Sequence, residues 1–268
     1  MITVSIVVHK TPRELLKSVL ASLKDEPAAV IYVVDNSPEP DLEWCASLDS
    51  RIDYSHVENR GFGNAHNIAI RKAAAAGSDF HLVLNPDVRW NGLILQQLTE
   101  VMDCRNDCVL IQPRIVYPDG SLQHTCRLLP TPLDMFARRF LPKALAARRV
   151  KRYLLPDSAY DAEFAAPYMQ GSFMLFRTSA LCAEGLFDER FFMYPEDIDI
   201  TRRLHRNHLT LYYPGVTIIH DHAASSQKFG RMMWIHISNM CRYFNKWGWF
   251  FDRERRRVNR GLLRSMKR

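Results

Sequence analysis

Short apolar runs alternate with longer amphipathic stretches over the first ninety residues or so. The apolar runs, rich in aliphatic and β-branched residues, are Val4–Val8, Val30–Val34 and Phe80–Leu84. Between them, the hydrophobic periodicity predicts helices over residues 14–23 and 64–76. This alternation predicts an α/β fold in which a parallel, doubly wound sheet is connected by right-handed helical crossovers.

Each of these predicted strands closes at a polar residue. The three closing residues are His9, Asp35 and Asn85. Ligands bind doubly wound sheets outside the carboxyl ends of the strands. The sequence therefore places the three side chains on one rim of the sheet. After about residue 110 the pattern is less regular, with strands predicted near residues 109–112, 172–177, 211–213 and 216–220.

The C-terminal segment, residues 226–268, combines an apolar helical face with many cationic residues. The apolar face, spaced at three and four residues, consists of Phe229, Met233, His236, Met240, Tyr243, Phe244 and Trp247. This spacing predicts a helix docked on the body of the protein. Beyond Trp247, aromatic residues stand beside arginines, a combination typical of segments that bind an anionic membrane surface.

The net charge of +7 is unevenly distributed. Residues 138–152 hold seven Lys/Arg and no acid, residues 226–268 hold twelve Lys/Arg and two acids, and the remainder is near −10. Two cationic segments on an acidic body favour contact with an anionic membrane surface. Nucleic acid is the alternative partner, but the acidic body would repel a long polyanion and no nucleic-acid-binding motif is present, so we expect none.

Composition and cysteine spacing favour a cytoplasmic location. No apolar run approaches the roughly 18 residues that span a bilayer, and residues 1–9 are predicted to be a buried strand instead of a secretory signal. The six cysteines include no Cys-x-x-Cys pair, which favours free thiols in a reducing compartment over a zinc site. We expect a protein associated peripherally with the inner face of the plasma membrane.

The stretch Phe187–Asp199 places four aromatic residues beside five carboxylates. Aromatic side chains exclude water and stack on sugar rings, and a carboxylate held against them has its pKa raised toward the range of a general base. Glu196 and Asp197 also suit the first turn of a solvated helix, where the helix dipole favours acids. A second acidic motif elsewhere in the chain favours the catalytic interpretation, with Asp197 as the base.

That second motif is Asn85-Pro86-Asp87, directly after a predicted strand. Proline fixes the turn, and a carboxylate at a strand end suits a hard divalent cation that also binds phosphate oxygens. His220 and His222 flank an acid at the end of another strand. Structural histidines are common, so metal ligation and a structural role both remain open at this point.

Two loops are candidates for binding a nucleotide. Asp35-Asn36-Ser37 can form an Asx turn before Pro38, or Asp35 can accept hydrogen bonds from a base or ribose. The loop at residues 59–64 (NRGFGN) lacks the GxGxxG fingerprint of dinucleotide-binding folds. Its backbone amides at the start of a helix can still bind a diphosphate.

Taken in order, these segments resemble the family 2 glycosyltransferases, which have the GT-A fold. The matching segments are 33–37 (VVDNS), 59–67 (NRGFGNAHN), 84–87 (LNPD), 170–177 (QGSFMLFR), 187–199 (FDERFFMYPEDID) and 218–220 (IIH). The resemblance is closest to the bacterial rhamnosyltransferases that build lipopolysaccharide O-antigen, core or related polysaccharides. The sequence departs from the family in having Asn85 in place of the first acid of Asp-x-Asp, and His9-Lys10-Thr11 where Tyr-Asn is frequent.

The resemblance implies a Rossmann-like α/β fold with a mostly parallel sheet flanked by helices. It implies a catalytic domain over residues 1–225, with a nucleotide-sugar half at about 1–115 and an acceptor half at about 116–225. Residues 226–268 would then form a basic, amphipathic helical extension.

The resemblance also implies roles for individual residues. The implied nucleotide-binding residues are His9, Thr11, Asp35, Asn36, Arg60, Gly61, Asn64, Asn67 and Asn85. A divalent cation, Mg²⁺ or Mn²⁺, would be held by Asp87 and His220, with Asp197 as the catalytic base. The implied sugar and acceptor pocket is lined by Gly171, Ser172, Phe192, Tyr194 and Glu196.

The implied activity is inverting transfer of a sugar from a nucleotide donor, because the sequence offers one base and no separate nucleophile. The favoured donor is dTDP-β-L-rhamnose, and the favoured acceptor is a lipid-linked or lipopolysaccharide glycan. Alternative donors are UDP-hexose, UDP-N-acetylhexosamine and UDP-galactofuranose. A catalytically inactive, membrane-associated assembly partner is the other alternative, and the presence of both Asp87 and Asp197 argues against it.

Overall fold

The computed structural model describes residues 1–221 and 230–266, leaving aside the side chains of residues 138–140, 143 and 231. The strands are β1 (Ile2–Val8), β2 (Ala28–Asp35), β3 (Ile52–His56), β4 (Phe80–Leu84), β5 (Val88–Arg89), β6 (Cys108–Val116), β7 (Phe164–Ala165), β8 (Phe173–Arg177) and β9 (Leu209–His220). The helices are α1 (Arg13–Leu23), α2 (Phe62–Ala75), α3 (Leu95–Asp103), α4 (Pro132–Phe140), α5 (Lys143–Leu154), α6 (Thr178–Ala183), α7 (Glu196–Leu204), α8 (Arg231–Trp247) and α9 (Arg253–Ser265).

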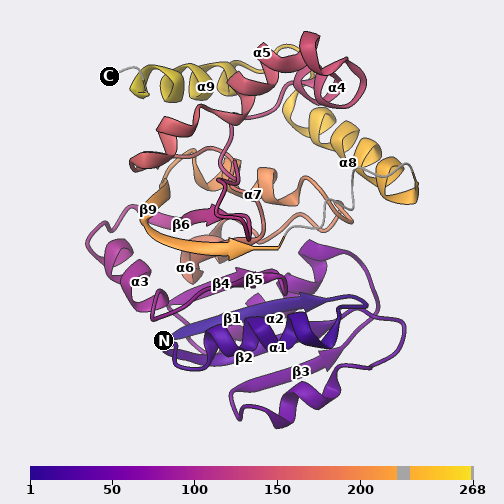
Figure 1. The fold of residues 1–268 in the computed structure, drawn as a ribbon, viewed down its shortest axis with the longest axis vertical. Coiled ribbons are helices and arrows are strands. Elements are labelled where there is room, and N and C mark those ends of the chain that lie inside the picture. The colour runs from indigo at the N-terminus through magenta and orange to yellow at the C-terminus, as the bar shows by residue number, and fades with distance from the viewer. Residues whose placement is uncertain (222–229, 267–268) are drawn as a thin grey trace.

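All the strands of the described residues belong to one mixed sheet. Their order is β3-β2-β1-β4-β8-β6-β9-β5, and β7 pairs with the outer side of β9. The N-terminal strands lie at one end of the long axis of the molecule, and α4, α5 and α9 lie at the other (Figure 1). The middle strands of the sheet therefore connect the N-terminal part of the molecule to the part that contains α4, α5 and α9.

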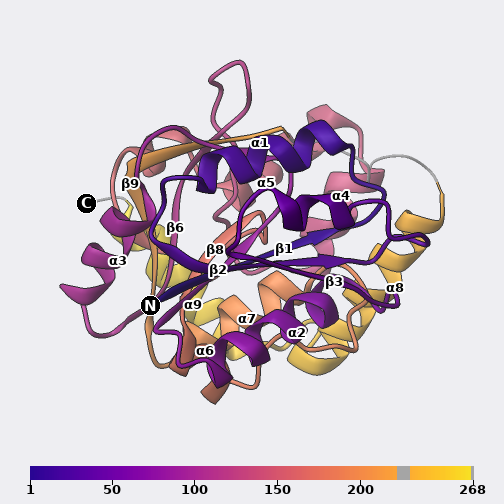
Figure 2. The ribbon, with the colours of Figure 1, turned by 90° about the horizontal axis from the view of Figure 1, so that it is seen from below.

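The N-terminal half of the sheet has the predicted parallel arrangement. β1 pairs with β2 and β4, and β2 pairs with β3, all in parallel. β4 is buried along its whole length, in agreement with its sequence, in which His81 is the single polar residue. α1 covers one face of these strands and α2 covers the other (Figure 2). The carboxyl ends of these strands consequently meet on one rim, as the sequence predicts.

The C-terminal half of the sheet is mixed. β8 lies between β4 and β6 and is antiparallel to both, whereas β6 and β9 are parallel. β9 is one continuous strand through Pro214-Gly215, where the sequence predicts two separate strands. The register between β6 and β9 shifts at this point, so the extra residues are accommodated as a bulge.

Helix α8, the first of the two helices of the C-terminal segment, packs on the body through the apolar face that the sequence predicts. Met240, Tyr243 and Phe244 are buried on this face. Phe229, expected on the same face, lies outside the described residues. Within residues 1–221 and 230–266, no helix combines the length and the hydropathy that crossing a membrane requires.

Helix α9 is also part of the folded body. Its Asn259 side chain exchanges two hydrogen bonds of 2.9 Å with the backbone N–H and C=O of Leu129. Leu262 and Arg255 are buried beneath the helix. The chain between α8 and α9 is therefore held at both ends, by α8 on one side and by the docked α9 on the other.

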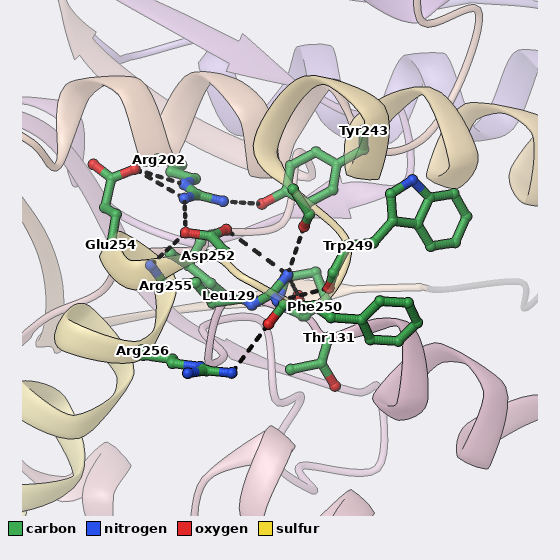
Figure 3. A network of polar contacts seen from close by, with 12 residues as sticks. Leu129, Thr131, Arg202, Tyr243, Trp249, Phe250, Asp252, Glu254, Arg255 and Arg256 are labelled. Carbon is green, nitrogen blue, oxygen red and sulfur yellow. Dashed lines mark hydrogen bonds and ion pairs between the residues drawn. The ribbon is translucent and has the colours of Figure 1, made fainter.

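A buried ion-pair network joins α7 to the start of α9 (Figure 3). Arg202 of α7, with only 2% of its side chain exposed, contacts Asp252 and Glu254 at 2.8 Å each. The Arg202 guanidinium also donates to the Tyr243 hydroxyl at 3.3 Å. Asp252 in turn caps α9 by accepting from the backbone N–H of Arg255 at 2.9 Å. Removing one partner of such a buried pair leaves an uncompensated charge in the interior.

We expect Asp252→Ala to lower the free energy of unfolding by about 3–5 kcal/mol, the usual cost of breaking a buried pair. Asp53→Ala is the matched control, because Asp53 pairs with Lys72 at the surface and both side chains are about two-fifths exposed. Such a surface pair contributes about 1 kcal/mol or less. Urea unfolding midpoints of the two variants measure the difference, and equal shifts would contradict the structural role of this network.

Candidate functional site

One rim of the N-terminal part of the sheet is formed by the ends of β1, β2 and β3. Asp35 is fully buried at the end of β2, where one carboxylate oxygen accepts from the Ser37 backbone N–H and the other from the Tyr54 hydroxyl, each at 2.8 Å. The Asx turn that the sequence allows is therefore formed. Burial, with Asp35 adding its charge, raises the pKa of Tyr54, so its hydroxyl stays a proton donor to Asp35.

The residues after β1 complete this rim. His9 Nδ1 donates to the Asn36 carbonyl at 2.8 Å, and the His9 backbone N–H donates to the Thr11 hydroxyl at 3.2 Å. The Asn36 side-chain oxygen is buried and has no hydrogen-bond partner among the described residues. His9, Thr11, Asp35 and Asn36 are thus brought together, with one acceptor left for a ligand.

Gly61 allows the loop before α2 to pack against residues Phe187–Asp199, which we call the acidic segment. Its φ is +103°, and a Cβ at this position would lie 2.1 Å from the Phe192 carbonyl oxygen, so only glycine fits. The Gly61 N–H donates to the Asn59 side chain at 3.1 Å. The amide expected to bind a diphosphate is therefore already used, and Gly61 serves close packing instead. Arg60 is exposed and pairs with Glu58.

Asn64 and Asn67 of α2 hold the segment after residue 186. The Asn67 amide accepts from the backbone N–H of Phe187 and donates to the Phe187 carbonyl and to Glu189, at 2.9–3.0 Å. Asn64 donates to Glu189 at 2.8 Å. Asn67 is buried with all its hydrogen-bonding groups engaged, so the expectation that it binds the nucleotide is wrong. It positions the acidic segment.

Asp197 lies in the first turn of α7, next to the start of β8. One carboxylate oxygen accepts from the Gly171 N–H at 3.1 Å and the other from the Ile198 N–H at 2.8 Å. A Cβ on Gly171 would lie 3.5 Å from Cβ of Asp197, so a small residue at 171 permits this approach. Ser172 follows, buried, and its carbonyl accepts from the Asn85 N–H at 2.9 Å. The predicted base and the end of β4 therefore lie on either side of Gly171 and Ser172.

The two adjacent carboxyls Glu196 and Asp197 differ in environment. Burial raises the pKa of Asp197 to about 6, an effect opposed by the two backbone N–H groups and by the charge of Arg127. Burial, and then the charge of Asp197, raise the pKa of Glu196 well above its ordinary value. Glu196 is therefore the neutral acid and Asp197 the proton acceptor of the pair. Glu196 is 4% exposed, which corrects the expectation that it lines the acceptor pocket.

Two further expected pocket residues lie on the segment before α7. Phe192 is half-buried, and its carbonyl accepts from the Phe62 backbone N–H at 3.0 Å. Tyr194 is half-buried and stacks edge-on against His236 of α8, with ring centroids 5.2 Å apart. Both side chains are partly accessible and precede Asp197 by a few residues, so the predicted aromatic wall stays a prediction.

Asp87 and His220 meet where β5 pairs with the end of β9. Their side chains approach at 3.2 Å, from Oδ1 of Asp87 to Nε2 of His220. The Gln123 amide donates to the His220 carbonyl at 2.7 Å, so its oxygen accepts from Nδ1 of His220 at 2.9 Å. Nδ1 therefore carries the proton, and in the neutral ring the Nε2 lone pair is directed toward Asp87.

The donor set of this pair fits a divalent cation. Oδ1 of Asp87 is buried without a hydrogen bond from the described residues. Its separation from Nε2 of His220, 3.2 Å, is close to the about 3 Å between adjacent ligands of an octahedral cation such as Mg²⁺. Within residues 1–221 and 230–266, no group of three or more acids, histidines or cysteines could ligate a metal. The remaining ligands would come from donor phosphates and water, and His222 lies outside the described residues.

Two residues of the site were not predicted from the sequence. Gln123, which orients His220, and Arg127, whose charge favours the ionised form of Asp197, both lie in the irregular segment between β6 and α4. Arg127 is held by the Tyr168 hydroxyl and the Gln170 side chain, each at 3.3 Å. No periodicity marks this segment, and the motif Leu122–Arg127 (LQHTCR) gives no signal by itself.

Solved structures of the same fold are GT-A glycosyltransferases. A structure of GalNAc-T7 with UDP, GalNAc and Mn²⁺ matches with a TM-score of 0.67 and 14% identity, over 94% of this chain and 48% of that one. The mannosyltransferase PcManGT from Pyrobaculum calidifontis, in complex with GDP-Man and Mn²⁺, matches with a TM-score of 0.56 and 14% identity, over 84% of this chain and 58% of that one. These likenesses show the fold.

The family follows from the sequence match. The model of glycosyl transferase family 2 matches residues 3–181, more than half of the chain, so this protein belongs to that family. The matched region contains the rim, the glycine loop and Asp87 but ends before Asp197 and His220.

Curated relatives of this chain include rhamnosyltransferases. N-acetylglucosaminyl-diphospho-decaprenol L-rhamnosyltransferase of Mycobacterium tuberculosis (strain ATCC 25618 / H37Rv) is 30% identical over 181 residues, which cover 63% of this chain and 58% of that relative. Rhamnosyltransferase WbbL of Escherichia coli (strain K12) is 26% identical over 248 residues, covering 89% of this chain and 90% of WbbL. The match to the mycobacterial enzyme thus spans little more than half its length.

Proposed function

We propose that this protein is a metal-dependent, inverting glycosyltransferase that moves L-rhamnose from dTDP-β-L-rhamnose onto a hydroxyl of a lipid-linked glycan. The observation that carries the proposal is Asp197: a carboxylate of raised pKa, fixed by two backbone N–H groups beside the aromatic segment of residues 191–194. A group with these properties can take a proton from a sugar hydroxyl near neutral pH.

Inversion is supported by the arrangement of acids. Direct displacement needs one base, on the face of the sugar opposite the leaving diphosphate. Asp197 fills that role, while Glu196 is buried and neutral and cannot act as a carboxylate nucleophile. Arg127, close enough for its charge to act on Asp197, favours the ionised base before the acceptor hydroxyl arrives.

Asp87 and His220 would hold the divalent cation. A bound cation supplies Lewis-acid stabilisation of the negative charge that develops on the departing diphosphate. Gln123 keeps the His220 ring in the tautomer that such a ligand requires. Two solved relatives of the fold contain Mn²⁺, which supports a divalent cation here without distinguishing Mn²⁺ from Mg²⁺.

The donor proposal rests on the rhamnosyltransferase relatives and on the apolar side chains near the site. A 6-deoxy sugar presents a methyl group, which an apolar surface accommodates. Phe192 and Met193 are half-buried and suit this role. Phe173, next to Ser172 in the sequence, is instead fully buried and packs edge-on against Trp90, with ring centroids 5.9 Å apart. It belongs to the core and cannot contact a sugar.

The acceptor proposal draws on the name of the mycobacterial relative, which acts on a decaprenol diphosphate carrying N-acetylglucosamine. A glycan on a lipid diphosphate would lie at the inner face of the plasma membrane. The two cationic segments suit this location, since each Lys or Arg near an anionic leaflet contributes about 1 kcal/mol to adsorption. We propose that the protein works there, as a peripheral membrane protein with no nucleic-acid partner.

Asp197→Asn tests the base. Turnover is expected to fall by about 10²–10⁴-fold, the usual contribution of general-base catalysis, while donor binding survives. In the parent protein, activity should fall as the pH drops through about 6, because protonation of Asp197 removes the base form. Asp161→Asn, an exposed acid paired with Arg114, is the matched control and should leave turnover unchanged. Near-normal turnover of Asp197→Asn would rule out this assignment.

Asp87→Ala tests the metal site, and is expected to abolish Mn²⁺-dependent binding of dTDP, with His220→Ala weakening it. Gln123→Leu leaves both ligands in place but removes the acceptor that orients His220, so Mn²⁺ affinity should fall by about 10–100-fold. Gln96→Leu, an exposed glutamine on α3, is the control. Titration calorimetry measures these affinities. Full transfer activity in excess chelator would contradict the metal role.

Competition between nucleotide sugars tests the donor. dTDP-rhamnose is expected to outcompete UDP-hexoses, UDP-N-acetylhexosamines and UDP-galactofuranose, with about 10²-fold as the most that an apolar pocket gives against a single added hydroxyl. Protection against thermal unfolding, measured with and without Mn²⁺, provides the ranking because a bound donor stabilises the folded state. Better protection by a UDP-sugar would overturn the donor and leave the family unchanged. Protection without transfer to any acceptor would point to the inactive assembly partner.

A further inference from the structure

One end of the molecule carries a group of exposed apolar side chains. They come from α4, α5 and the loop between α8 and α9, and we call them the apolar edge: Leu133, Phe136, Leu145, Phe250 and Phe251. Phe251 is 91% exposed and Leu145 is 72% exposed. An open groove of about 460 Å³ separates α4 from the loop and is lined by Leu133, Phe136, Trp249 and Phe250. Adjacent exposed apolar residues of this kind mark an interaction surface.

Exposed arginines follow the aromatic loop of the apolar edge. The exposed face of α9 carries five of them, which we call the arginine stripe: Arg253, Arg256, Arg257, Arg260 and Arg264. Among the described residues, none of the five forms an ion pair with an acid, whereas the two acids at the start of α9, Asp252 and Glu254, both pair with Arg202. The stripe is therefore free to attract an anionic partner.

The aromatic loop is held in its exposed position from below. Arg255 is buried and donates to the carbonyls of Gly248 and Trp249, at 3.2 and 2.8 Å. Arg256 donates to the Phe250 carbonyl at 3.1 Å. The Trp249 and Phe250 rings point away from this network (Figure 3). Because these hydrogen bonds already fix the backbone, inserting the two rings into a binding partner would require little further loss of conformational entropy in the loop.

The position of the apolar edge relative to the site is also informative. α4, α5 and α9 form the end of the molecule opposite the nucleotide-sugar half (Figure 1). If this end binds a membrane, the rim around Asp35 lies away from the membrane, in the aqueous phase from which a soluble nucleotide sugar would bind. This orientation brings the acceptor half nearest to the membrane.

We propose that the apolar edge and the arginine stripe form the face by which this protein binds an anionic lipid bilayer, with Phe250 and Phe251 inserted at the level of the headgroups. This inference rests on the proposed function and extends it, because it identifies which face of the protein contacts the membrane. A bilayer interface accepts protruding aromatic rings and contacts arginines over a broad area, as this end presents them. Trp247 lies outside this face, because it is half-buried, stacks against Arg202 and donates to Asp199 at 2.7 Å.

Deletion of the C-terminal residues is a poor test, since it removes Asp252 and Glu254 and leaves Arg202 buried without its acids. Point variants of the full chain avoid this problem. Phe250→Ser/Phe251→Ser should lower partitioning onto phosphatidylcholine–phosphatidylglycerol vesicles by about tenfold or more. Arg257→Gln/Arg260→Gln should lower it about fivefold per arginine at low salt, and much less at high salt.

Matched controls distinguish binding through this face from non-specific adsorption through other exposed apolar residues. Trp234 is 66% exposed, as is Phe250, but lies in the first turn of α8, more than three helical turns from the loop. Leu48 is exposed in the nucleotide-sugar half. Trp234→Ser and Leu48→Ser should bind vesicles like the parent, and unchanged thermal unfolding of all variants confirms that they fold.

Three outcomes would overturn the proposal. Parent-like vesicle binding by Phe250→Ser/Phe251→Ser would show that the apolar edge is not inserted. Equal loss in Trp234→Ser would show that the binding is not confined to this face. A parent dimer in lipid-free solution that the aromatic variant dissociates would show that a second copy of the chain covers the edge. Vesicle binding requires neither donor nor acceptor, so the result is independent of whether the donor assignment holds.

Discussion

The close backbone contact between Gly61 and Phe192 holds the two halves of the site together. A side chain at Gly61 would overlap the Phe192 carbonyl, and one at Gly63 would meet the ring-bearing Cβ of Phe187 at 2.9 Å. Because both positions lack a side chain, the start of α2 can lie directly against the acidic segment. That contact fixes where α7 begins, and with it the place of Asp197 beside β8. The catalytic geometry thus depends on two glycines that contribute no functional group.

Three aspartates of the site differ in their hydrogen bonding because their surroundings differ. Asp35 accepts two hydrogen bonds and is part of a turn. Asp197 accepts two backbone N–H groups, yet burial raises its pKa to about 6. Asp87 has one oxygen that accepts no hydrogen bond from the described residues. These differences suit Asp35 to a structural or nucleotide-facing role, Asp197 to the proposed proton-accepting role and Asp87 to the proposed metal-binding role. Gln123 orients His220 beside Asp87, and the positive charge of Arg127 favours the ionised form of Asp197.

Much of this arrangement could be predicted from the sequence, where local pattern and fold agree. The buried strands β1, β2 and β4 stand out as mostly aliphatic runs, although β1 and β4 also bury the polar residues Thr3, Ser5 and His81. Asp87 was found because it closely follows such a strand, and His220 because it ends one. β3 (Ile52–His56) escaped prediction because its residues, half-buried or exposed, do not form an apolar run. Asn67 was misassigned because the glycine loop suggested a ligand, whereas the helix turns its side chain to the Phe187 backbone. Gln123 and Arg127 take their roles from tertiary contacts alone.

The neutrality of Glu196 has a consequence for the electrical balance of the donor complex. A nucleoside diphosphate sugar brings a dianionic diphosphate to a rim that already carries Asp87 and an ionised Asp197. A second ionised carboxylate next to Asp197 would repel that dianion across a poorly screened interior, where Coulomb forces are several times stronger than in water. By remaining protonated, Glu196 fills its space in the core without adding charge. The adjacent pair Glu196 and Asp197 thereby carries a single negative charge, which limits the electrostatic work of bringing such a substrate to the rim.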